Sequence, residues 1–148
     1  MTTMSFFSYS HTDKESVGYI ANKLKNEYGT TIFFDEWSLI PGKKFQDELS
    51  KGLEKSSSCA VFIGANTTSG WKMEEVSKAI DMQTQDNNFN VIPVLLPNAK
   101  KENLNGFLQS CTCVEFKELD DSNALYRLHC GINNTAPLNP DSKFITTK

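Results

Sequence analysis

The sequence predicts an α/β fold of the flavodoxin-like type, in which a doubly wound, five-stranded parallel sheet carries helices on both faces. Apolar runs of strand length alternate five times with segments of helical spacing, which favours parallel strands joined by right-handed crossovers. One run, residues 59–63, is continuously apolar, as in strands that are covered on both faces. A chain of 148 residues is long enough for one domain with a proper core. We therefore expect the strand order 2-1-3-4-5.

Each expected element has its own local signal. Residues 4–9 form a short β-like run, and Thr12 with Glu15 fits the capping box of a helix start. Apolar residues then recur at spacings of three and four until Gly29, which ends this helix. Pro93 lies inside the fourth strand, so we expect irregular pairing there. The other expected elements are a strand at 31–34, a helix at 44–55, a strand at 59–63, a helix from about 71, strands at 91–96 and 113–116, and a helix at 124–132.

The domain is expected to span residues 1–132. Residues 133–148 contain two prolines and few apolar side chains, which is typical of a linker or a free end.

Composition excludes several classes of protein. A net charge of −3, with basic residues scattered among acids, argues against nucleic-acid binding. No apolar stretch reaches the length of a membrane span, and the first residues do not resemble a signal peptide. The spacing of Cys111 and Cys113 is too tight for a usual zinc site, so we expect reduced thiols, no metal and a cytoplasmic location.

The loop of residues 35–42 carries more chemistry than a connection needs. It follows the second strand, at the edge of the sheet where open α/β folds bind ligands, and it contains two acids, an indole and a Pro-Gly turn signal. An ordinary surface loop fits the same pattern, so this stretch alone leaves both interpretations open.

Common nucleotide motifs are absent from the sequence. No Gly-rich dinucleotide fingerprint follows the first strand, and no phosphate loop ending in Lys-Ser or Lys-Thr occurs. A phospho-receiver would need acids after the first and third strands, where this chain has residues 8–10 (Ser-Tyr-Ser) and Gly64. His11 and His129 have no partners at metal-ligand spacing.

Trp71 and Glu75 are the remaining candidate pair. They are four residues apart, so they project from one face of a helix near the carboxyl edge of the sheet, while Glu74 should face solvent. Glu75 could equally be present because a carboxylate favours the positive end of a helix dipole. Spacing alone leaves both accounts open.

Several stretches together resemble one family. Residues 6–13 look like the first box of Toll/interleukin-1 receptor (TIR) domains, and residues 33–42 look like their second box with the so-called BB loop. Residues 70–75 are similar to the Trp-x-x-x-Glu helix of NAD-cleaving members, and residues 91–97 to their fourth strand. The chain therefore resembles a TIR domain, especially the prokaryotic kind, over about residues 4–132.

The resemblance implies an enzyme that takes NAD as its substrate and needs no cofactor or metal. Glu75 would be the catalytic residue, and the products would be nicotinamide with ADP-ribose or a cyclic isomer. Trp37 and Trp71 would offer aromatic faces to the rings of NAD, Asp35 would fix the loop geometry, and the end of the first strand would contact ribose and phosphates. The substrate-binding residues implied are Ser8, Tyr9, Asp35, Trp37, Leu39, Gly42 and Trp71.

The family also implies partners and a setting. TIR enzymes act as assemblies, so self-association through the loop of residues 35–43 is expected, together with a sensor domain or protein in prokaryotic anti-phage immunity. Many catalytic relatives carry a basic residue near the first box or in the loop, where this chain has His11 and Ile40, so the phosphate contacts stay open. Two alternatives remain: a non-catalytic TIR module that only recruits other proteins, and a flavodoxin-like domain that binds another nucleotide.

Overall fold

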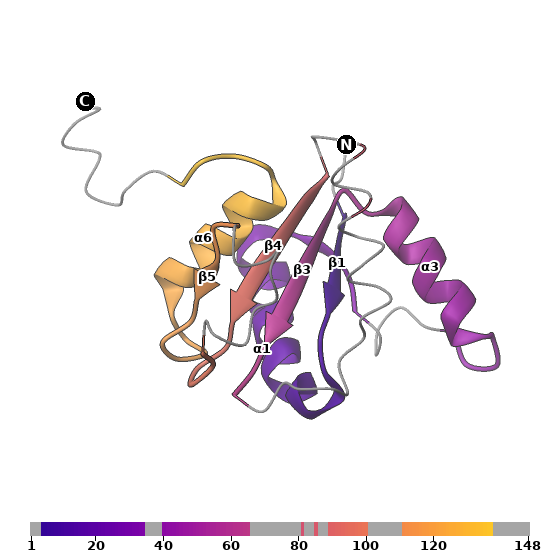
Figure 1. Cartoon of the computed structure of the whole chain (residues 1–148), viewed down its shortest axis with the longest axis horizontal. Helices are drawn as coiled ribbons and strands as arrows, with labels where there is room; N and C mark the ends of the chain where they lie inside the picture. The colour runs from indigo at the N-terminus through magenta and orange to yellow at the C-terminus, as the bar shows by residue number, and fades with distance from the viewer. Residues whose placement is uncertain are drawn as a thin grey trace.

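The sheet has the predicted architecture. A computed structural model describes residues 4–34, 40–65, 81, 85, 89–100 and 111–137. Within these ranges five strands form one parallel sheet in the order β2-β1-β3-β4-β5, which confirms the expected order (Figure 1). The elements are β1 (Met4–Ser8), the 3-10 turn η1 (His11–Asp13), α1 (Lys14–Tyr28), β2 (Thr31–Phe33), α3 (Phe45–Lys55), β3 (Ser58–Ile63), β4 (Asn90–Leu95), β5 (Val114–Glu115) and α6 (Ser122–Ile132).

Some expected segments lie outside the described residues. The helix from about residue 71 is among them, although Asp81 and Gln85 are helical. The tail beyond Pro137 also falls outside the described residues, so the division at residue 132 stays a prediction.

Helices cover both faces of the sheet. On one face, α1 and α6 pack side by side over a continuous apolar cluster (Figure 1). Phe62 lies at its centre with 0% exposure, and its ring meets that of Phe7 at a centroid distance of 4.8 Å. On the opposite face, Leu53 of α3 packs over Phe6 and Phe33. Burial of both faces explains why β3 reads as an unbroken apolar run.

Pairing along β4 is regular, so the expected irregularity at Pro93 is wrong. The register with β3 runs without a break from Ser58↔Asn90 to Ile63↔Leu95. The amides of Asn90 and Leu96 both donate toward β3, to the carbonyls of Ser57 (3.4 Å) and Ile63 (2.8 Å). Since alternate residues of a parallel strand bond to opposite neighbours, Pro93 faces β5. The missing N–H of Pro93 therefore costs no hydrogen bond to β3. On the other side, the ladder with β5 begins only at Val94, one residue later.

The start of α1 differs from the predicted capping box. The helix begins at Lys14 with Asp13 as its N-cap, and no side chain caps it. The Thr12 hydroxyl instead lies 3.1 Å from that of Ser10, within the 3-10 turn that precedes the helix. The turn moves the helix start by one residue and takes Thr12 out of the capping position. At the other end, Gly29 adopts a left-handed conformation with φ 67° and ends the helix as predicted.

Close contact between α3 and the sheet requires a glycine at position 52, which has no Cβ atom. A Cβ atom there would lie 2.6 Å from Cδ2 of Phe33 and 2.8 Å from its Cζ. The Phe33 ring cannot easily withdraw, because it is stacked on Phe6 at 5.2 Å with an interplanar angle of 9°.

Gly52→Ala should therefore destabilise the fold, although alanine normally favours a helix by about 0.8–1 kcal/mol over glycine. Overpacking against Phe33 should outweigh this gain and lower the free energy of unfolding by about 1–3 kcal/mol. Urea unfolding measures the change, with the exposed neighbour Lys51→Ala as a control expected to stay within about 0.5 kcal/mol. A Gly52→Ala variant more stable than the wild type would contradict this packing.

A histidine joins α6 to the end of α1. The ring of His129 stacks on that of Tyr28 at 4.1 Å and 14°, and burial lowers the pKa of His129 below its ordinary value of 6.5. The folded state thus binds a proton less readily than the unfolded chain. Between the folded pKa of His129 and its ordinary value of 6.5, stability therefore rises with pH, because the unfolded state holds more protons.

Loss of this stability should begin as the pH falls through 6.5 and continue down to the folded pKa. His129→Phe keeps an aromatic ring against Tyr28 but cannot titrate. We expect the unfolding free energy of the wild type to fall more steeply than that of His129→Phe between about pH 7 and pH 5.5. Chemical denaturation at several pH values tests this, and parallel curves for the two proteins would refute it.

Candidate active site at the carboxyl edge of the sheet

Three chain segments meet where the central strands end. In Figure 1 the arrowheads of β1, β3 and β4 all point to the lower edge of the sheet, so Ser8 and Gly64 lie at one edge. This is the edge at which open parallel sheets bind ligands. The position of Ser8 at the end of the first strand agrees with the sequence prediction.

Ser8 has an unsatisfied hydroxyl. Its side chain is 1% exposed, and its Oγ lacks a hydrogen-bond partner within the described part of the chain. Ser5 and Ser58 share this property, but they are paired in register near the amino ends of β1 and β3, away from the carboxyl edge. Because a buried, unpaired hydroxyl is costly, Ser8 is the described group best suited to donate to a ligand at this edge.

Tyr9 belongs to the core. It is 2% exposed, and its ring is stacked on Phe34 at 5.3 Å and 30°. This packing fixes the chain where it leaves β1 and so orients the neighbouring Ser8. A contact between Tyr9 and a substrate would have to come from a group other than the face of its ring.

Asp13 is a residue of this edge that the sequence analysis did not select. A Cβ atom on Gly64 would lie 2.6 Å from Asp13 Oδ2, so the carboxylate rests directly on the backbone after β3. The glycine is required by this close approach. Asp13 meets Gly64 only in the folded chain. In the sequence, the sign that could have drawn attention to Asp13 was its position directly before an apolar helix pattern.

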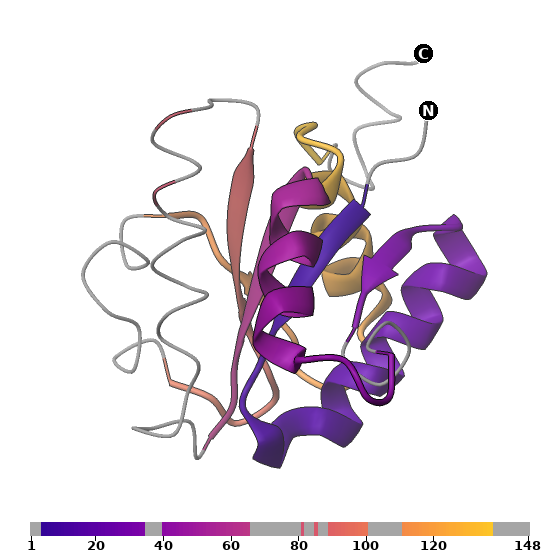
Figure 2. The same ribbon diagram turned by 90° about the vertical axis from the view of Figure 1, so that its right-hand side faces the viewer.

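The second half of the loop is a tight turn before α3. Gly42 has a φ of 92°, which favours glycine, and the Lys43 amide donates to the Ile40 carbonyl at 3.1 Å. The Ile40 amide donates to Glu48 Oε1 at 3.0 Å, which ties the turn to the helix. Figure 2 views the molecule from the side of α3 and shows this turn at the lower end of that helix, the same end as the carboxyl edge.

Gly42 and Ser8 do not line one cavity. Gly42 borders a hollow of about 730 Å³ that runs along α3 and also includes Phe33, Ile40 and Lys51. Ser8 and Tyr9 are not part of it. The structure therefore brings Asp13 onto Gly64, places Ser8 on the adjacent strand opposite Val61, and leaves Gly42 beside a separate hollow.

The other predicted site residues lie outside the described ranges. They are Asp35, Trp37, Leu39, Trp71 and Glu75. Their predicted roles stay predictions.

Two further chemical features concern the described residues only. The described residues contain no group of three or more His, Cys, Asp or Glu side chains placed to hold a metal ion. Their helices include none that is both long enough and apolar enough to cross a membrane.

Comparison with known families identifies the domain. A family model described as the TIR domain matches residues 6–129. The chain belongs to the TIR domain family. The match includes the edge formed by Ser8, Asp13 and Gly64, and it confirms the family expected from the sequence. The prokaryotic NAD-cleaving subtype stays a prediction.

One curated relative is the stimulator of interferon genes protein of Magallana gigas. It is 29% identical to this TIR domain over 123 residues, which are 79% of this chain and 29% of the relative. The chain thus spans less than a third of that protein.

Solved structures share the fold of this TIR domain. The metazoan TIR-STING receptor from C. gigas, in complex with 2′,3′-cGAMP, aligns with a TM-score of 0.69 at 24% identity, over 88% of this chain and 39% of that one. The TIR domains of the activated Roq1 resistosome, which recognises the pathogen effector XopQ, align with a TM-score of 0.70 at 19% identity, over 86% and 98%. The TIR domain of the Toll-related receptor TRR-2 from Hydra magnipapillata aligns with a TM-score of 0.62 at 18% identity, over 86% of this chain and 96% of that one.

Proposed function

We propose that this TIR domain cleaves NAD to nicotinamide and ADP-ribose, or to a cyclic isomer of ADP-ribose, with Glu75 as the catalytic residue. The observation that carries the proposal is the position of Glu75, four residues after Trp71 and inside the region that matches the family. The unsatisfied hydroxyl of Ser8 at the carboxyl edge supports it, because ribose hydroxyls and phosphates would satisfy such a group.

The chemistry needs only one carboxylate. Glycosidases usually use a second acid to protonate a poor leaving oxygen. The nicotinamide of NAD is already a cationic pyridinium, so it leaves as a neutral ring when the bond to ribose breaks. The electron pair of that bond goes to the ring nitrogen, and the ribose carries the positive charge. Glu75 would hold the ribose hydroxyls and offset this charge.

The fate of the sugar cation decides the product. Water gives ADP-ribose with loss of a proton, whereas attack by a nucleophile of the adenosine portion closes a cyclic isomer. Chromatography after incubation with NAD tests the proposal and separates the two products. Absence of any nicotinamide release, even from concentrated or clustered protein, would overturn it.

We further propose that activity requires self-association through the loop of residues 35–43. The part of the loop that the structure describes includes Ile40, which is 57% exposed and is held in place by Glu48. An exposed apolar side chain on a fixed turn suits contact with another copy of the chain.

The specific activity of the enzyme should therefore increase with protein concentration. Head-to-tail contacts that do not close into a ring make longer assemblies as concentration rises, so the rate should grow faster than linearly. Nicotinamide release measured over a hundredfold dilution series, about the range that separates free and assembled protein, checks this. Strict proportionality down to the lowest dilution would contradict it.

A non-catalytic recruiting module is the second candidate. The same exposed Ile40 favours it, because a turn that only binds another protein does not need a catalytic carboxylate such as that proposed for Glu75. Assembly without nicotinamide release would select this function. The sensor partner, the cytoplasmic location and the role in anti-phage immunity are proposals that rest on the resemblance to prokaryotic TIR domains.

A further inference from the structure

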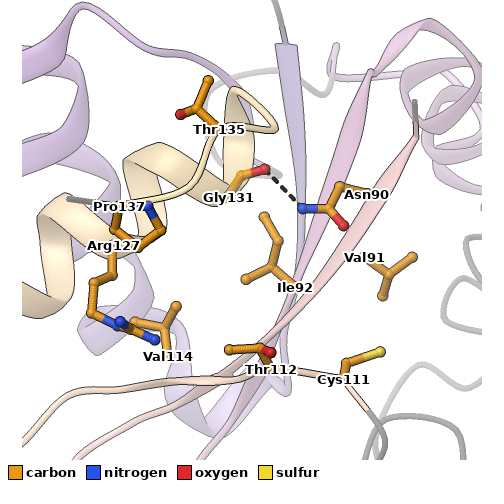
Figure 3. A pocket seen from close by; sticks show the side chains of 10 residues that line it. All are labelled: Asn90, Val91, Ile92, Cys111, Thr112, Val114, Arg127, Gly131, Thr135 and Pro137. Carbon is orange, nitrogen blue, oxygen red and sulfur yellow. Dashed lines mark hydrogen bonds between the residues drawn. The ribbon is translucent and has the colours of Figure 1, made fainter. Parts of the chain in front are cut away.

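A second cavity lies away from the carboxyl edge. Its volume is about 370 Å³, within the range of small-molecule sites. It is bordered by Asn90, Val91 and Ile92, the first residues of β4, and by residues of β5 and α6 (Figure 3). Ser8, Asp13 and Gly64 do not border it. A ligand here would not occupy the proposed NAD site.

The cavity has an apolar floor and fixed polar walls. Ile92 and Val114 are buried and form the floor. The side chain of Asn90 donates to the Gly131 carbonyl at 2.9 Å, which ties the start of β4 to α6 and fixes the amide. Figure 3 shows the Arg127 guanidinium on the opposite side of the cavity from Asn90, with Ile92 between them.

Among the described residues that line the cavity, Arg127 is the charged one. Arg127 is half-buried and has no ion pair with any described residue. No Asp or Glu is among the described residues that line the cavity, and Thr112 adds a hydroxyl. A guanidinium beside apolar side chains and without an ion-pair partner among the described residues is unusual in a chain with a net charge of −3. It favours an anion, because its N–H groups form a planar fork that matches two oxygens.

We propose that this cavity binds a small monocarboxylate with an apolar body. The carboxylate would accept hydrogen bonds from Arg127, and the apolar body would cover Ile92 and Val114. A phosphate monoester would bring close to two negative charges to a single cation, so one excess charge would be desolvated without a partner. A neutral molecule of the same shape would form no charge-assisted bond with Arg127.

Titrations of the ¹⁵N-labelled chain of 148 residues at constant ionic strength test the proposal. Benzoate is the probe, phenyl phosphate tests the second charge, and benzyl alcohol lacks the charge. We expect benzoate to cause saturable shifts in the amide signals of Thr112, Val114 and Gly131. Benzyl alcohol should bind at least about tenfold more weakly, because it cannot form the charge-assisted bonds.

Variants assign the effect to the guanidinium. Arg127→Gln should weaken benzoate binding at least about tenfold. Arg127→Lys keeps the charge but not the planar fork, so its affinity for benzoate should lie between those of the wild type and Arg127→Gln. Lys117→Gln removes one positive charge from an exposed residue outside the cavity and should change affinity less than about twofold. Unchanged spectra away from α6 would show that the variants are folded.

Three results would overturn the proposal. They are the absence of saturable shifts with benzoate, equal binding of benzoate by wild type and Arg127→Gln, and tighter binding of phenyl phosphate than of benzoate. None of them bears on nicotinamide release, so this proposal and that of NAD cleavage fail independently.

Discussion

Replacing Glu75 by glutamine is expected to lower the rate of nicotinamide release by at least about a hundredfold, the usual effect of losing one preorganised electrostatic group. The amide keeps the size of the side chain and its ability to bond to ribose hydroxyls. It loses the negative charge that, in the proposed mechanism, would offset the sugar cation. Substrate binding should therefore change less than turnover. Chromatographic assays of nicotinamide release over a range of NAD concentrations separate the two effects.

Glu74→Gln provides a matched control. It removes the same charge from the neighbouring residue, which the helical spacing predicts to face solvent. We expect its activity to stay within about twofold of the wild type, as for an exposed charge. Equal loss of activity in both variants would show that net charge matters rather than the position of one carboxylate. Full activity of Glu75→Gln would exclude the proposed mechanism.

Phe62→Ala is expected to have the largest effect on stability. The side chain has 0% exposure in the central strand β3 and packs against Phe7 beneath α1 and α6. Truncation of such a buried ring costs about 3–5 kcal/mol, since it removes apolar contacts and leaves a cavity. This is a large part of the roughly 5–15 kcal/mol that stabilises a typical domain. Urea or thermal unfolding followed by circular dichroism measures the loss.

Ile40→Ala serves as the control for this measurement. Ile40 is also a large apolar residue, but it is 57% exposed, so its truncation should change stability by less than about 0.5 kcal/mol. A cost below about 1 kcal/mol for Phe62→Ala would mean that the two faces of β3 are not packed as described.

Much of the fold could be predicted because burial leaves a clear pattern in the sequence. The unbroken apolar run at 59–63 predicted a central strand, and β3 is buried along its whole length. The spacing of Ala124, Leu125, Leu128 and Ile132 predicted a helix, and all four side chains are buried in α6. The parallel sheet followed from the crossover rule, and the strand order from the flavodoxin-like fold expected at this chain length.

Features that depend on neighbours in space could not be predicted in this way. The effect of Pro93 depends on which adjacent strand its nitrogen faces, and this is fixed only by the pairing register. Thr12 and Glu15 fit a capping box, but a 3-10 turn delivers Asp13 to the helix start instead. The same turn brings Asp13 onto Gly64, residues that are far apart in the sequence.

The short pairing of β5 has a dynamic consequence. Two register pairs and the bond from the Phe116 amide to the Leu95 carbonyl (2.9 Å) hold this strand, while Pro93 offers it no donor. Amide hydrogens of β5 should thus exchange with solvent through local opening, well before those of β3, which is bonded on both sides. Val114 lies in this margin of the sheet and borders the cavity beside α6, so a molecule bound over it is expected to slow the exchange, and β5 would then report ligand binding.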